Sequence, residues 1–420
     1  MAQLTDDCFA HGGALLRLDD ALRLLGERLS VVAETEELAL PDCLGRVLAE
    51  DVTCAFDVPP SDNSAVDGYA VFFDDLDPEQ EARLPVAGRV TAGHPLQAVA
   101  ERGTAIRIFT GALMPEGPDT VMMQEDCDLA DDGSSVVIRP GIKRGANRRK
   151  RGEDIAAGSV VLHAGQRLRP PDLGQAAASG RRSLVVRQAL RVALFSTGDE
   201  LREPGEPLEP GQIYDSNRYG IAGLLRGLGC QVTDLGILAD KREAIQAALA
   251  AAAERHDLIV TSGGVSVGEE DHVKQAVEAL GALHAWRLAI KPGRPIAFGQ
   301  VGRVPFVGLP GNPAAVMVTF LNIVRPLLLR LLGASELEPQ RFAVRTAFAH
   351  RKKKDRREWI RASLRRNGGG EIEAVKFPRE GAGILSSLVE SDGLVELPEE
   401  MTHLEEGSMV TFLPFSEVMT

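Results

Sequence analysis

The 420-residue sequence predicts a multidomain α/β protein with a mostly parallel sheet, and three observations support this fold class. A chain of this length exceeds what one hydrophobic core usually organises, so two to four domains are expected. Apolar strands alternate with helices between residues 186 and 335, which is typical of βαβ units. Short β-type runs separated by Gly/Pro turns dominate residues 51–145 and 336–420, which predicts two β-rich units.

The α/β domain, residues 186–335, is predicted element by element. The expected strands are Val192–Ser196, Val232–Leu235, Leu258–Thr261 and Phe306–Leu309, and the expected helices are Ser216–Gly227, Arg242–Ala253, Glu269–Leu280 and Pro313–Leu332. Ligands of parallel sheets collect beyond the carboxyl ends of the strands, so a site is expected in the loops that follow these strands.

The flanking segments predict three further units. Apolar residues recur at helical spacing over Asp19–Leu29, with Asp19 as the expected N-cap, and residues 1–15 form a leader with little pattern. Ala156–Arg187 is predicted to form short strands and one helix, and this segment is expected to pair with the N-terminal helix. Residues 15–50 and 146–185 would then form a discontinuous mixed α+β linker domain, with residues 51–145 as an insertion. The C-terminal strands are expected at Val344–Ala347, Glu358–Leu364, Glu371–Ala374, Gly393–Leu397 and Met409–Phe412.

Composition and charge exclude several classes of function. With 44% hydrophobic and 25% charged residues the chain is typical of a soluble protein, and its net charge of −13 argues against nucleic-acid binding. Five dispersed cysteines without a CxxC pair indicate a reducing compartment and no thiolate metal site. No secretory signal is visible, and the longest apolar run, near Ile323–Leu332, is interrupted by charges. A cytoplasmic protein without a membrane span is therefore expected.

Three turns at predicted strand ends carry the clearest chemical pattern. They are Thr261–Asp271, Gly308–Pro313 and Phe195–Leu201, and each combines glycine with hydroxyl, amide or acidic side chains. Glycine allows close backbone approach to a ligand, and the N–H groups of a helix N-terminus favour an oxyanion. Thr261–Asp271 alone is equally well explained as a tight turn with an ordinary cap, and Gly308–Pro313 alone is more often just a loop. Their convergence on one sheet edge favours a shared cleft.

Basic segments offer candidate anion sites on this acidic protein. In Ile290–Pro295, prolines could hold Lys291 and Arg294 toward an oxyanion, although a basic surface turn has the same composition. The run Lys143–Arg151 is the richest local cluster of cations, although such runs are usually solvated loops. We interpret the basic stretch Arg351–Arg366 as exposed strand faces and a turn.

The insertion contains an unusual run of hard oxygen donors. Pro59–Val71 carries Asp, Asn and Ser residues before a β segment, and such oxygens suit magnesium. Motifs for zinc proteases, P-loops and dinucleotide-binding GxGxxG turns are absent from the sequence.

Eight motifs in sequence order resemble the molybdopterin molybdenumtransferase family, the MoeA-type enzymes that also occur as the E domain of fusions such as gephyrin. They are DNSAVDGYAV at 62–71, RIFTGALMPEG at 107–117, RRKRGEDI at 148–155, FSTGDEL at 195–201, IYDSNR at 213–218, SGGVSVGEEDHV at 262–273, AIKPGRPIAFG at 289–299 and GLPGNP at 308–313. The resemblance covers about residues 15–415.

The resemblance implies an elongated four-domain homodimer with a molybdopterin-binding α/β domain and a C-terminal β-barrel. The implied active site is shared between the α/β domain of one subunit and the inserted domain of the other. The implied reaction takes adenylylated molybdopterin and molybdate and, with Mg²⁺, gives molybdenum cofactor and AMP. Transient contacts with the molybdopterin adenylyltransferase and with recipient molybdoenzymes are also implied.

The resemblance also implies roles for individual residues. The implied catalytic residues are Asp67, Thr110, Asp154, Glu200, Asp240 and Asp271, of which Glu200, Asp271 and Asp67 are candidate Mg²⁺ ligands. The implied substrate-binding residues are Ser262, Gly263, Gly264, Ser266, Arg287, Lys291, Arg294, Pro310, Gly311, Asn312 and Pro313. Arg287 and Arg294 stand where bacterial relatives often have lysine, so the geometry of anion contacts is expected to differ.

Two other functions fit part of this pattern. The related adenylyltransferase that makes AMP-molybdopterin shares the α/β domain, but it is implied to be a single small domain and it consumes ATP. A scaffold comparable to gephyrin's E domain would bind receptor peptides, but this chain lacks the partner domain of such fusions. The transferase accounts for all four predicted units.

Overall fold

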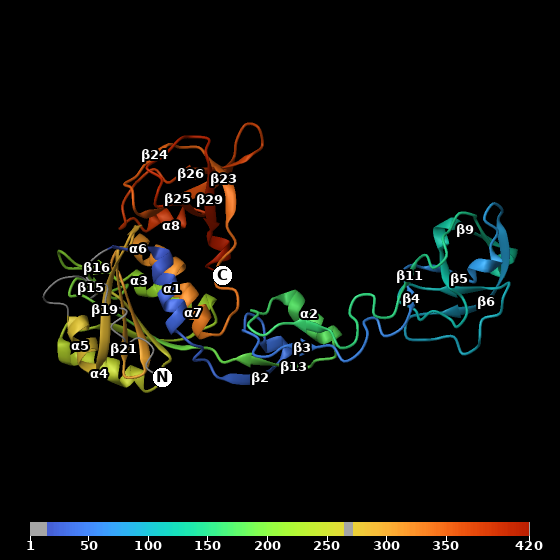
Figure 1. Cartoon of the computed structure of the whole chain (residues 1–420), viewed down its shortest axis with the longest axis horizontal. Coiled ribbons are helices and arrows are strands. Elements are labelled where there is room, and N and C mark those ends of the chain that lie inside the picture. Colours follow the sequence, from blue (N-terminus) through green and yellow to red (C-terminus); the bar gives the residue numbers. More distant parts are fainter. Residues whose placement is uncertain (1–14, 264–271, 420) are drawn as a thin grey trace.

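The computed structural model describes residues 15–263 and 272–419 and shows an elongated molecule. Figure 1 places the α/β domain and the C-terminal domain at one end, the linker domain in the middle and the inserted β domain at the other end. The inserted domain therefore lies far from the α/β domain of its own chain.

A seven-stranded sheet organises the α/β domain. Its strands, in spatial order, are β1 (Leu15–Leu16), β19 (Gly281–Leu288), β21 (Pro295–Val301), β22 (Val304–Leu309), β18 (Leu258–Ser262), β14 (Arg191–Thr197) and β17 (Gln231–Leu238). The last four run parallel, whereas β21 is antiparallel to both of its neighbours. The carboxyl ends of β22, β18, β14 and β17 consequently meet at one edge.

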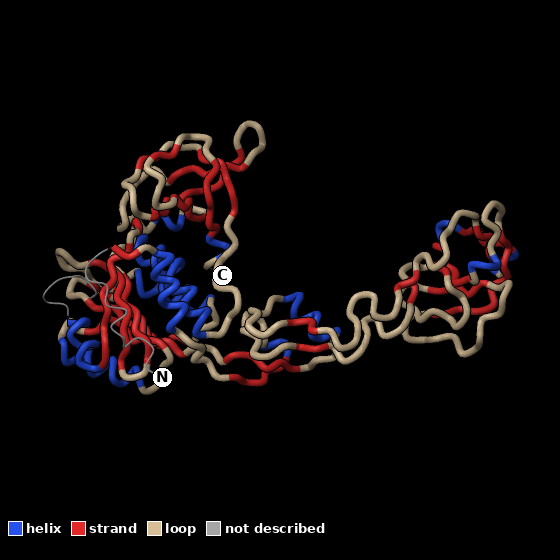
Figure 2. The backbone as a smooth tube through the Cα atoms, viewed as in Figure 1, coloured by secondary structure: helices blue, strands red, loops and turns tan. Residues whose placement is uncertain are grey.

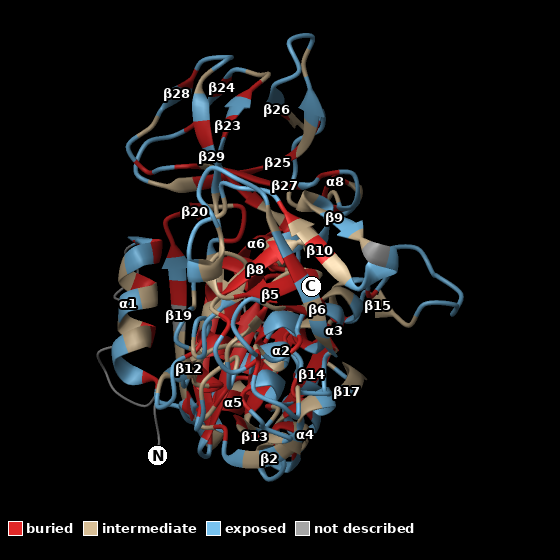
Figure 3. Ribbon diagram, turned by 90° about the vertical axis from the view of Figure 1, so that its right-hand side faces the viewer, coloured by how far each residue is buried: buried red, intermediate tan, exposed pale blue. Residues whose placement is uncertain are grey.

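Helices cover both faces of this sheet, because the strand side chains that point to either face are apolar and need to be buried. The helices are α1 (Leu18–Arg28), α3 (Asn217–Gly227), α4 (Arg242–Ala253), α5 (His272–Leu280), α6 (Pro313–Thr319), the π-helical segment η6 (Phe320–Val324) and α7 (Arg325–Leu331). Val192 and Leu194 of β14 pack toward α1, α3, α6 and α7, whereas Ala193 and Phe195 pack toward α4 and α5. Figure 3 shows the sheet buried and the outer face of α1 exposed.

The helix Pro313–Leu331 is the one candidate for a membrane span among the described residues. Its 19 residues are long and apolar enough by length and composition, but 83% of the apolar window is buried inside the protein. It is therefore the central core helix of the α/β domain, and the sequence prediction underestimated its apolar length.

The predicted strands of the α/β domain are confirmed, and so are its predicted helices where they are described; residues 269–271 of the expected helix Glu269–Leu280 lie outside the described residues. Three two-residue strands were not predicted, namely β15 (Leu201–Arg202), β16 (Ile213–Tyr214) and β20 (Ile290–Lys291), and two longer strands were missed. Strands β19 and β21 were not predicted, because the alternating Gly281–Leu288 segment and the proline-rich turn after it were interpreted as a connection. The expected Asp19 cap is wrong, since α1 begins at Leu18 and its N-cap is Arg17, whose side chain makes no capping hydrogen bond to the helix.

The linker segments pair as two small antiparallel ladders. Strand β2 (Thr35–Ala39) pairs with β13 (Ser183–Arg187), and β3 (Val52–Thr53) pairs with β12 (Val160–Leu162), beside helix α2 (Pro170–Ala178). Figure 2 shows these short strands between long connecting loops. The two segments thus meet through strands. The predicted pairing with the N-terminal helix is wrong, because Ala21 and Leu25 of α1 pack in the α/β core.

The inserted domain is β-rich, as predicted. Its six-stranded sheet has the order β8 (Thr120–Met123), β5 (Gly68–Val71), β7 (Ala105–Ile108), β6 (Ala82–Val90), β10 (Ser135–Ile138) and β9 (Cys127–Ala130), with a separate ladder of β4 (Asn63–Ser64) and β11 (Arg148–Arg149). A Cβ on Gly68 would lie 1.8 Å from the carbonyl oxygen of Met122, so the close pairing of β5 with β8 requires glycine there.

The C-terminal domain closes into a five-stranded barrel, as the family resemblance implied. The ring runs β25 (Arg357–Arg366), β26 (Ile372–Lys376), β23 (Phe342–Thr346), β29 (Met409–Pro414) and β27 (Gly393–Leu397), which pairs back with β25. A further ladder joins β24 (His350–Arg351) to β28 (His403–Leu404), and helix α8 spans Ser386–Val389. The short strand β20 (Ile290–Lys291) of the α/β domain pairs with β25, which joins the two domains.

Candidate active site

The carboxyl ends of three parallel strands lie side by side, as the sequence predicted. Ser196 of β14 is opposite Ser262 of β18, and Ser262 is opposite Leu309 of β22. Gly263, with a φ of +87°, donates its N–H to the carbonyl of Leu309 at 3.1 Å. A Cβ on Gly263 would approach the Thr197 carbonyl to 3.0 Å, so glycine allows these three ends to converge.

Asn217, at the start of α3, ties two of these loops together. Its side-chain amide donates to Ser262 Oγ at 3.0 Å and to the Gly311 carbonyl at 2.7 Å. Sequence reasoning missed this residue, although the IYDSNR motif contains it. Its role is positional, because it fixes the turn after β18 against the turn after β22.

Two predicted carboxylates, Glu200 and Asp240, lie beyond the ends of β14 and β17. Glu200 is exposed, and its carboxyl group folds back over Gly198, where a Cβ would meet it at 2.5 Å. Asp240 Oδ1 accepts a hydrogen bond of 3.3 Å from the Thr197 hydroxyl. These oxygens lie on the edge where the sequence placed the site.

The remaining predicted residues of this edge are Gly264, Ser266 and Asp271, and they lie outside the described residues. Within residues 15–263 and 272–419, no three His, Cys, Asp or Glu side chains gather so as to hold a metal ion. The candidate Mg²⁺ ligand Glu200 belongs to the α/β domain and Asp67 to the inserted domain. These domains lie at opposite ends of the elongated molecule, so the two carboxylates do not meet within one protomer.

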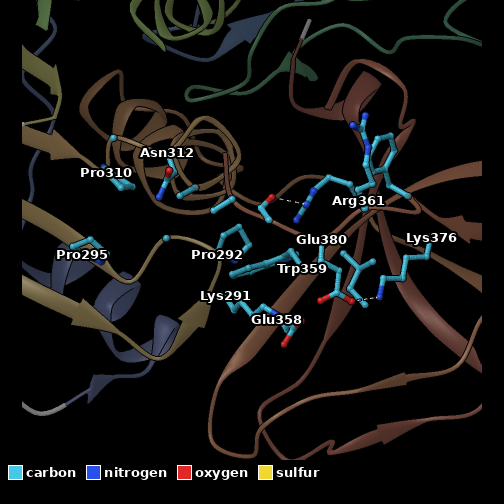
Figure 4. Close-up of a pocket in the computed structure, with 18 of the residues that line it drawn as sticks. Lys291, Pro292, Pro295, Pro310, Asn312, Glu358, Trp359, Arg361, Lys376 and Glu380 are labelled. Carbon is cyan, nitrogen blue, oxygen red and sulfur yellow. Dashed lines mark hydrogen bonds and ion pairs between the residues drawn. The ribbon is translucent and has the colours of Figure 1, made fainter. Parts of the chain in front are cut away.

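A cavity of about 480 Å³ lies between the α/β domain and the barrel. Gly263, Lys291, Pro310, Gly311 and Asn312 line it from the α/β side, and all five were predicted to bind substrate. The barrel side is formed by His350, Glu358, Trp359, Arg361, Lys376, Arg379 and Glu380. Figure 4 shows Pro310 and Asn312 facing Arg361 and Glu380 across this space. Pro313, at the first turn of α6, does not line it.

Arg361 is a buried cation of this cavity that no described carboxylate balances directly. It is 9% exposed, donates to Ser387 Oγ at 3.1 Å and to the Gly381 carbonyl at 2.9 Å, and forms no ion pair within the described part of the chain. Burial lowers the pKa of Arg361, and the more distant Glu380 and Glu358 partly offset this. By contrast, Lys376 is paired with Glu380. A buried, unpaired guanidinium favours an anionic ligand.

The three predicted cations of the 287–294 segment differ in their placement. Lys291 lines the cavity, and its ammonium group donates to Glu358 Oε1 at 2.7 Å. Arg287 and Arg294 are exposed, lie outside the cavity lining, and make no side-chain hydrogen bond or ion pair to any described residue. They were grouped with Lys291 by sequence, but the turn separates them from it.

The interpretation of Arg351–Arg366 as exposed strand faces is wrong in its central part. Glu358, Trp359 and Arg361 are 2%, 1% and 9% exposed, because β25 passes through the barrel wall and against the α/β domain. The signal that could have shown this is the apolar pair Trp359–Ile360 between Glu358 and Arg361, since charged residues beside buried apolar residues in a strand need partners.

In the inserted domain, Asp67 and Thr110 form a pre-ordered pair. Asp67 Oδ1 accepts from the backbone N–H of Thr110 at 2.8 Å and from its hydroxyl at 2.7 Å. These two bonds, with the nearby Arg107 guanidinium, hold the pKa of Asp67 below its usual range. Asp154 is exposed in the connection to the linker domain, where its N–H donates to the Val58 carbonyl.

Three of the six cations in the basic run Lys143–Arg151 form ion pairs within the chain. Arg144 is paired with Asp119 and Asp74, Arg148 lies 3.5 Å from Asp62, and Arg151 lies 2.5 Å from Asp57. Three of its cations are thus balanced by aspartates of the insertion and its connections. Asp62, one of the hard oxygen donors of Pro59–Val71, is engaged in this way as well.

Comparisons with known proteins cover nearly the whole chain. Residues 16–180 match a family model described as "MoeA N-terminal region (domain I and II)", 193–330 match "Probable molybdopterin binding domain" and 343–415 match "MoeA C-terminal region (domain IV)". A molybdopterin molybdenumtransferase of Haemophilus influenzae is 40% identical over 96% of this chain and 100% of its own length. One of Nostoc sp. is 36% identical over 92% of this chain and 90% of its own.

A solved structure supports the same relationship. The crystal structure of a molybdopterin biosynthesis MoeA protein from Pyrococcus horikoshii OT3 has a TM-score of 0.80 and 29% sequence identity, covering 95% of this chain and 99% of that one. The arrangement of all four units is therefore similar in both proteins.

Proposed function

This chain belongs to the MoeA family of molybdopterin molybdenumtransferases, and from that premise we propose how its residues carry out the reaction. The enzyme inserts molybdenum into molybdopterin in molybdenum cofactor biosynthesis. The finer proposal is that adenylylated molybdopterin and molybdate react, with release of AMP. The observation that carries the site assignment is the cavity between the α/β domain and the barrel, with its buried, unpaired Arg361.

The cavity suits a tetrahedral dianion such as molybdate. Arg361 offers a planar guanidinium whose fork can donate two parallel hydrogen bonds to adjacent oxygens. Lys291 contacts the same space from the opposite wall, and the turn Pro310–Asn312 leads into the N-terminus of the core helix, where N–H groups favour anions. The carboxylates Glu200 and Asp240 lie beyond neighbouring strand ends of the same sheet edge, so the site extends from the cavity along that edge.

The donor chemistry of that edge fits Mg²⁺. Glu200 and Asp240 supply carboxylate oxygens and Thr197 a hydroxyl, which are the ligands magnesium prefers. When bound, Mg²⁺ would neutralise the charge on the phosphate oxygens of the substrate. The protein's own part is to hold the phosphate against backbone N–H groups and to keep molybdate close to it.

We propose that the catalytic site is completed by a second copy of the chain. Asp67 and Thr110 are ordered at the end of the molecule opposite the cavity, and Asp154 lies on the connection leading to them. An elongated homodimer with a two-fold axis can bring the inserted domain of one subunit to the α/β domain of the other. This arrangement accounts for a carboxylate that is pre-ordered by hydrogen bonds yet distant from the rest of the site.

The cellular setting follows from the same proposal. The substrate is a small molecule supplied by the molybdopterin adenylyltransferase, and recipients are molybdoenzymes, so transient contacts with both are proposed. A cytoplasmic location agrees with the free cysteines and with the burial of the central helix.

Reconstitution tests the proposal. The purified protein is incubated with adenylylated molybdopterin, molybdate and Mg²⁺, without ATP, and both AMP and active cofactor are measured, the latter by activation of a molybdenum-free apoenzyme. We expect AMP and cofactor to appear in equal amounts. A reaction that requires ATP would contradict the proposal and indicate an adenylyltransferase. Cofactor formation without release of AMP would contradict only the proposal that the substrate is adenylylated.

A further inference from the structure

Lys291, a residue of the α/β domain, is held by a carboxylate of the C-terminal barrel. Its ammonium nitrogen lies 2.7 Å from Glu358 Oε1, and the two side chains are 42% and 3% exposed. Figure 4 shows both at the wall of the cavity, with Lys291 arriving from the α/β side and Glu358 from the barrel. The ion pair therefore joins a half-exposed cation to a deeply buried anion from another domain.

The backbone fixes this contact as well as the side chains. Strands β20 and β25 pair in parallel, with Ile290 opposite Arg357 and Lys291 opposite Glu358. A direct cross-strand pair needs little side-chain ordering to form, so its geometry is more constrained than that of a surface ion pair. The position of Lys291 thus depends on where the barrel strand lies.

Further nitrogen groups of the barrel surround Glu358. His350 Nε2 lies 3.0 Å from the same Oε1 atom, Lys376 Nζ lies 3.3 Å from His350 Nδ1, and an Arg356 nitrogen is 3.6 Å from Oε2. Among the described residues, Lys291 is the α/β-domain cation in this group. Since Oε2 is buried without a hydrogen bond, removing Lys291 would leave the carboxylate still less compensated.

The pairing changes what Lys291 can contribute to the cavity. An ammonium group has three N–H donors, and one is used on Glu358, so two remain for a ligand. The charge of Lys291 is already balanced by Glu358, so Lys291 directs hydrogen bonds, whereas the buried Arg361 has a charge that no carboxylate of the described residues pairs with.

We propose that Glu358, supported by His350, is a positioning residue that orients Lys291 toward the molybdate oxyanion. Glu358 acts through Lys291 and does not itself touch the substrate. This inference rests on the proposed function, because it assumes that the anion of the reaction enters this cavity. The barrel would then contribute to anion binding, and this contribution would require that the barrel packs against the α/β domain.

The test is a double-mutant cycle on the molybdate dependence of cofactor formation by the full-length protein. We expect Glu358→Ala to raise the KM for molybdate about ten-fold, and Lys291→Met to raise it by a similar factor, with kcat less affected. The double variant Lys291→Met/Glu358→Ala should be no worse than Lys291→Met alone, because the carboxylate acts only through the lysine. Glu358→Gln, which keeps an acceptor for the ammonium group, should recover most of the wild-type KM.

Glu396→Gln is the matched control. Glu396 is also a largely buried barrel carboxylate, paired with Arg341 and Arg357, and it does not line the cavity. The control should alter thermal stability without changing the KM for molybdate. An unchanged KM in Glu358→Ala, or effects of the two single changes that multiply in the double variant, would overturn the positioning role.

A second measurement separates this inference from the proposed function. Molybdate binding is measured by calorimetry with the same variants, using molybdate alone as the probe. A wild-type protein that binds molybdate but forms no cofactor contradicts the proposed function, and the non-additive pattern in Kd then still supports the role of Glu358. Additive changes in Kd would overturn that role.

Discussion

The two ends of the molecule differ in how they prepare charged groups. At the α/β–barrel end, cations line a cavity of about 480 Å³, and Arg361 is buried without an ion-pair partner among the described residues. At the other end, the inserted domain presents one carboxylate, Asp67, held by two hydrogen bonds from Thr110. The first end is suited to bind an anion, and the second offers an oriented acid group.

This difference indicates that neither end is a complete site. Arg144, Arg148 and Arg151 at that end are paired with aspartates, so the charge of these three cations is not available to hold an anionic substrate. If each end of the protomer carries half of the site, a second subunit related by a two-fold axis is the simplest way to bring the two halves together. The following experiments test that division, beginning with the largest expected effect.

The largest effect is expected from mixing two inactive variants. Asp67→Ala removes the carboxylate of the insertion, and Glu200→Ala removes one from the strand-end edge, so each homodimer should be close to inactive with an unchanged fold. If the site is shared, one of the two sites in every mixed dimer is intact, and activity should return to up to half of wild type per mixed dimer. Activity is measured after subunit exchange, with mixed dimers identified by mass spectrometry.

Mixed dimers that stay inactive would contradict the shared site and leave the reaction itself untouched. Mixing each variant with itself is the control, since exchange alone should restore nothing. A Glu200→Ala protein that retains near-wild-type activity would contradict the role of Glu200 at the outset.

The next prediction is that the inserted domain can be destabilised without destabilising the α/β domain. Gly68→Ala places a Cβ 1.8 Å from the Met122 carbonyl and should destabilise the inserted domain by about 1–3 kcal/mol or more. Hydrogen exchange should show the loss in β5 and β8, while the α/β sheet keeps its protection. Gly26→Ala in α1, where nothing lies within 4 Å of the new methyl group, is the control and should not destabilise the protein. Loss of protection in both ends of Gly68→Ala would show that they unfold together.

The sequence predicted the α/β end well because its signals are local. Each parallel strand there is a short apolar run followed by a helical period, and the turns Gly308–Pro313 and Phe195–Leu201 mark the strand ends. Gly263, Lys291 and Pro310 were found for the same reason. What could not be predicted is the barrel wall of the cavity, because Glu358 and Arg361 become site residues only when β20 pairs with a strand 67 residues away along the chain.

The same limit explains the errors in charge assignment. The run Lys143–Arg151 was the richest basic segment, but its partners Asp57, Asp62, Asp74 and Asp119 are distant in sequence. Conversely, the basic stretch after Arg351 was interpreted as exposed although it contains the unpaired Arg361. Whether a charge is available to a ligand depends on long-range pairing, which periodicity and composition do not reveal.

Arg361→Met should weaken anion binding by an intermediate amount. The variant keeps an unbranched side chain but loses charge-assisted hydrogen bonds worth roughly 1.5–3 kcal/mol, so the KM for molybdate should rise about ten- to a hundred-fold. Arg365→Met, on the same strand but exposed and paired with Glu373, is the control and should leave the KM unchanged. An Arg361→Met enzyme that saturates at the wild-type molybdate concentration would show that the cavity is not the anion site.

The smallest effect concerns Asp67 and its dependence on pH. The backbone N–H of Thr110, then its hydroxyl, and then the charge of Arg107 hold the pKa of Asp67 below its usual range. Thr110→Val keeps the backbone donor and loses the hydroxyl, so this pKa should move upward toward the ordinary value without reaching it.

A carboxylate with a depressed pKa is ionised above that pKa, and its contribution is lost as pH falls through it. The acidic limb of the pH–activity profile, normalised to each protein's own maximum, should therefore lie at higher pH in Thr110→Val than in wild type. Carboxyl-carbon NMR titration of Asp67 measures the shift directly, and Thr110→Ser, which retains the hydroxyl, should titrate like wild type. An unmoved pKa in Thr110→Val would mean that the hydroxyl does not maintain the ionised carboxylate, and the contrast between the two ends would then rest on backbone geometry alone.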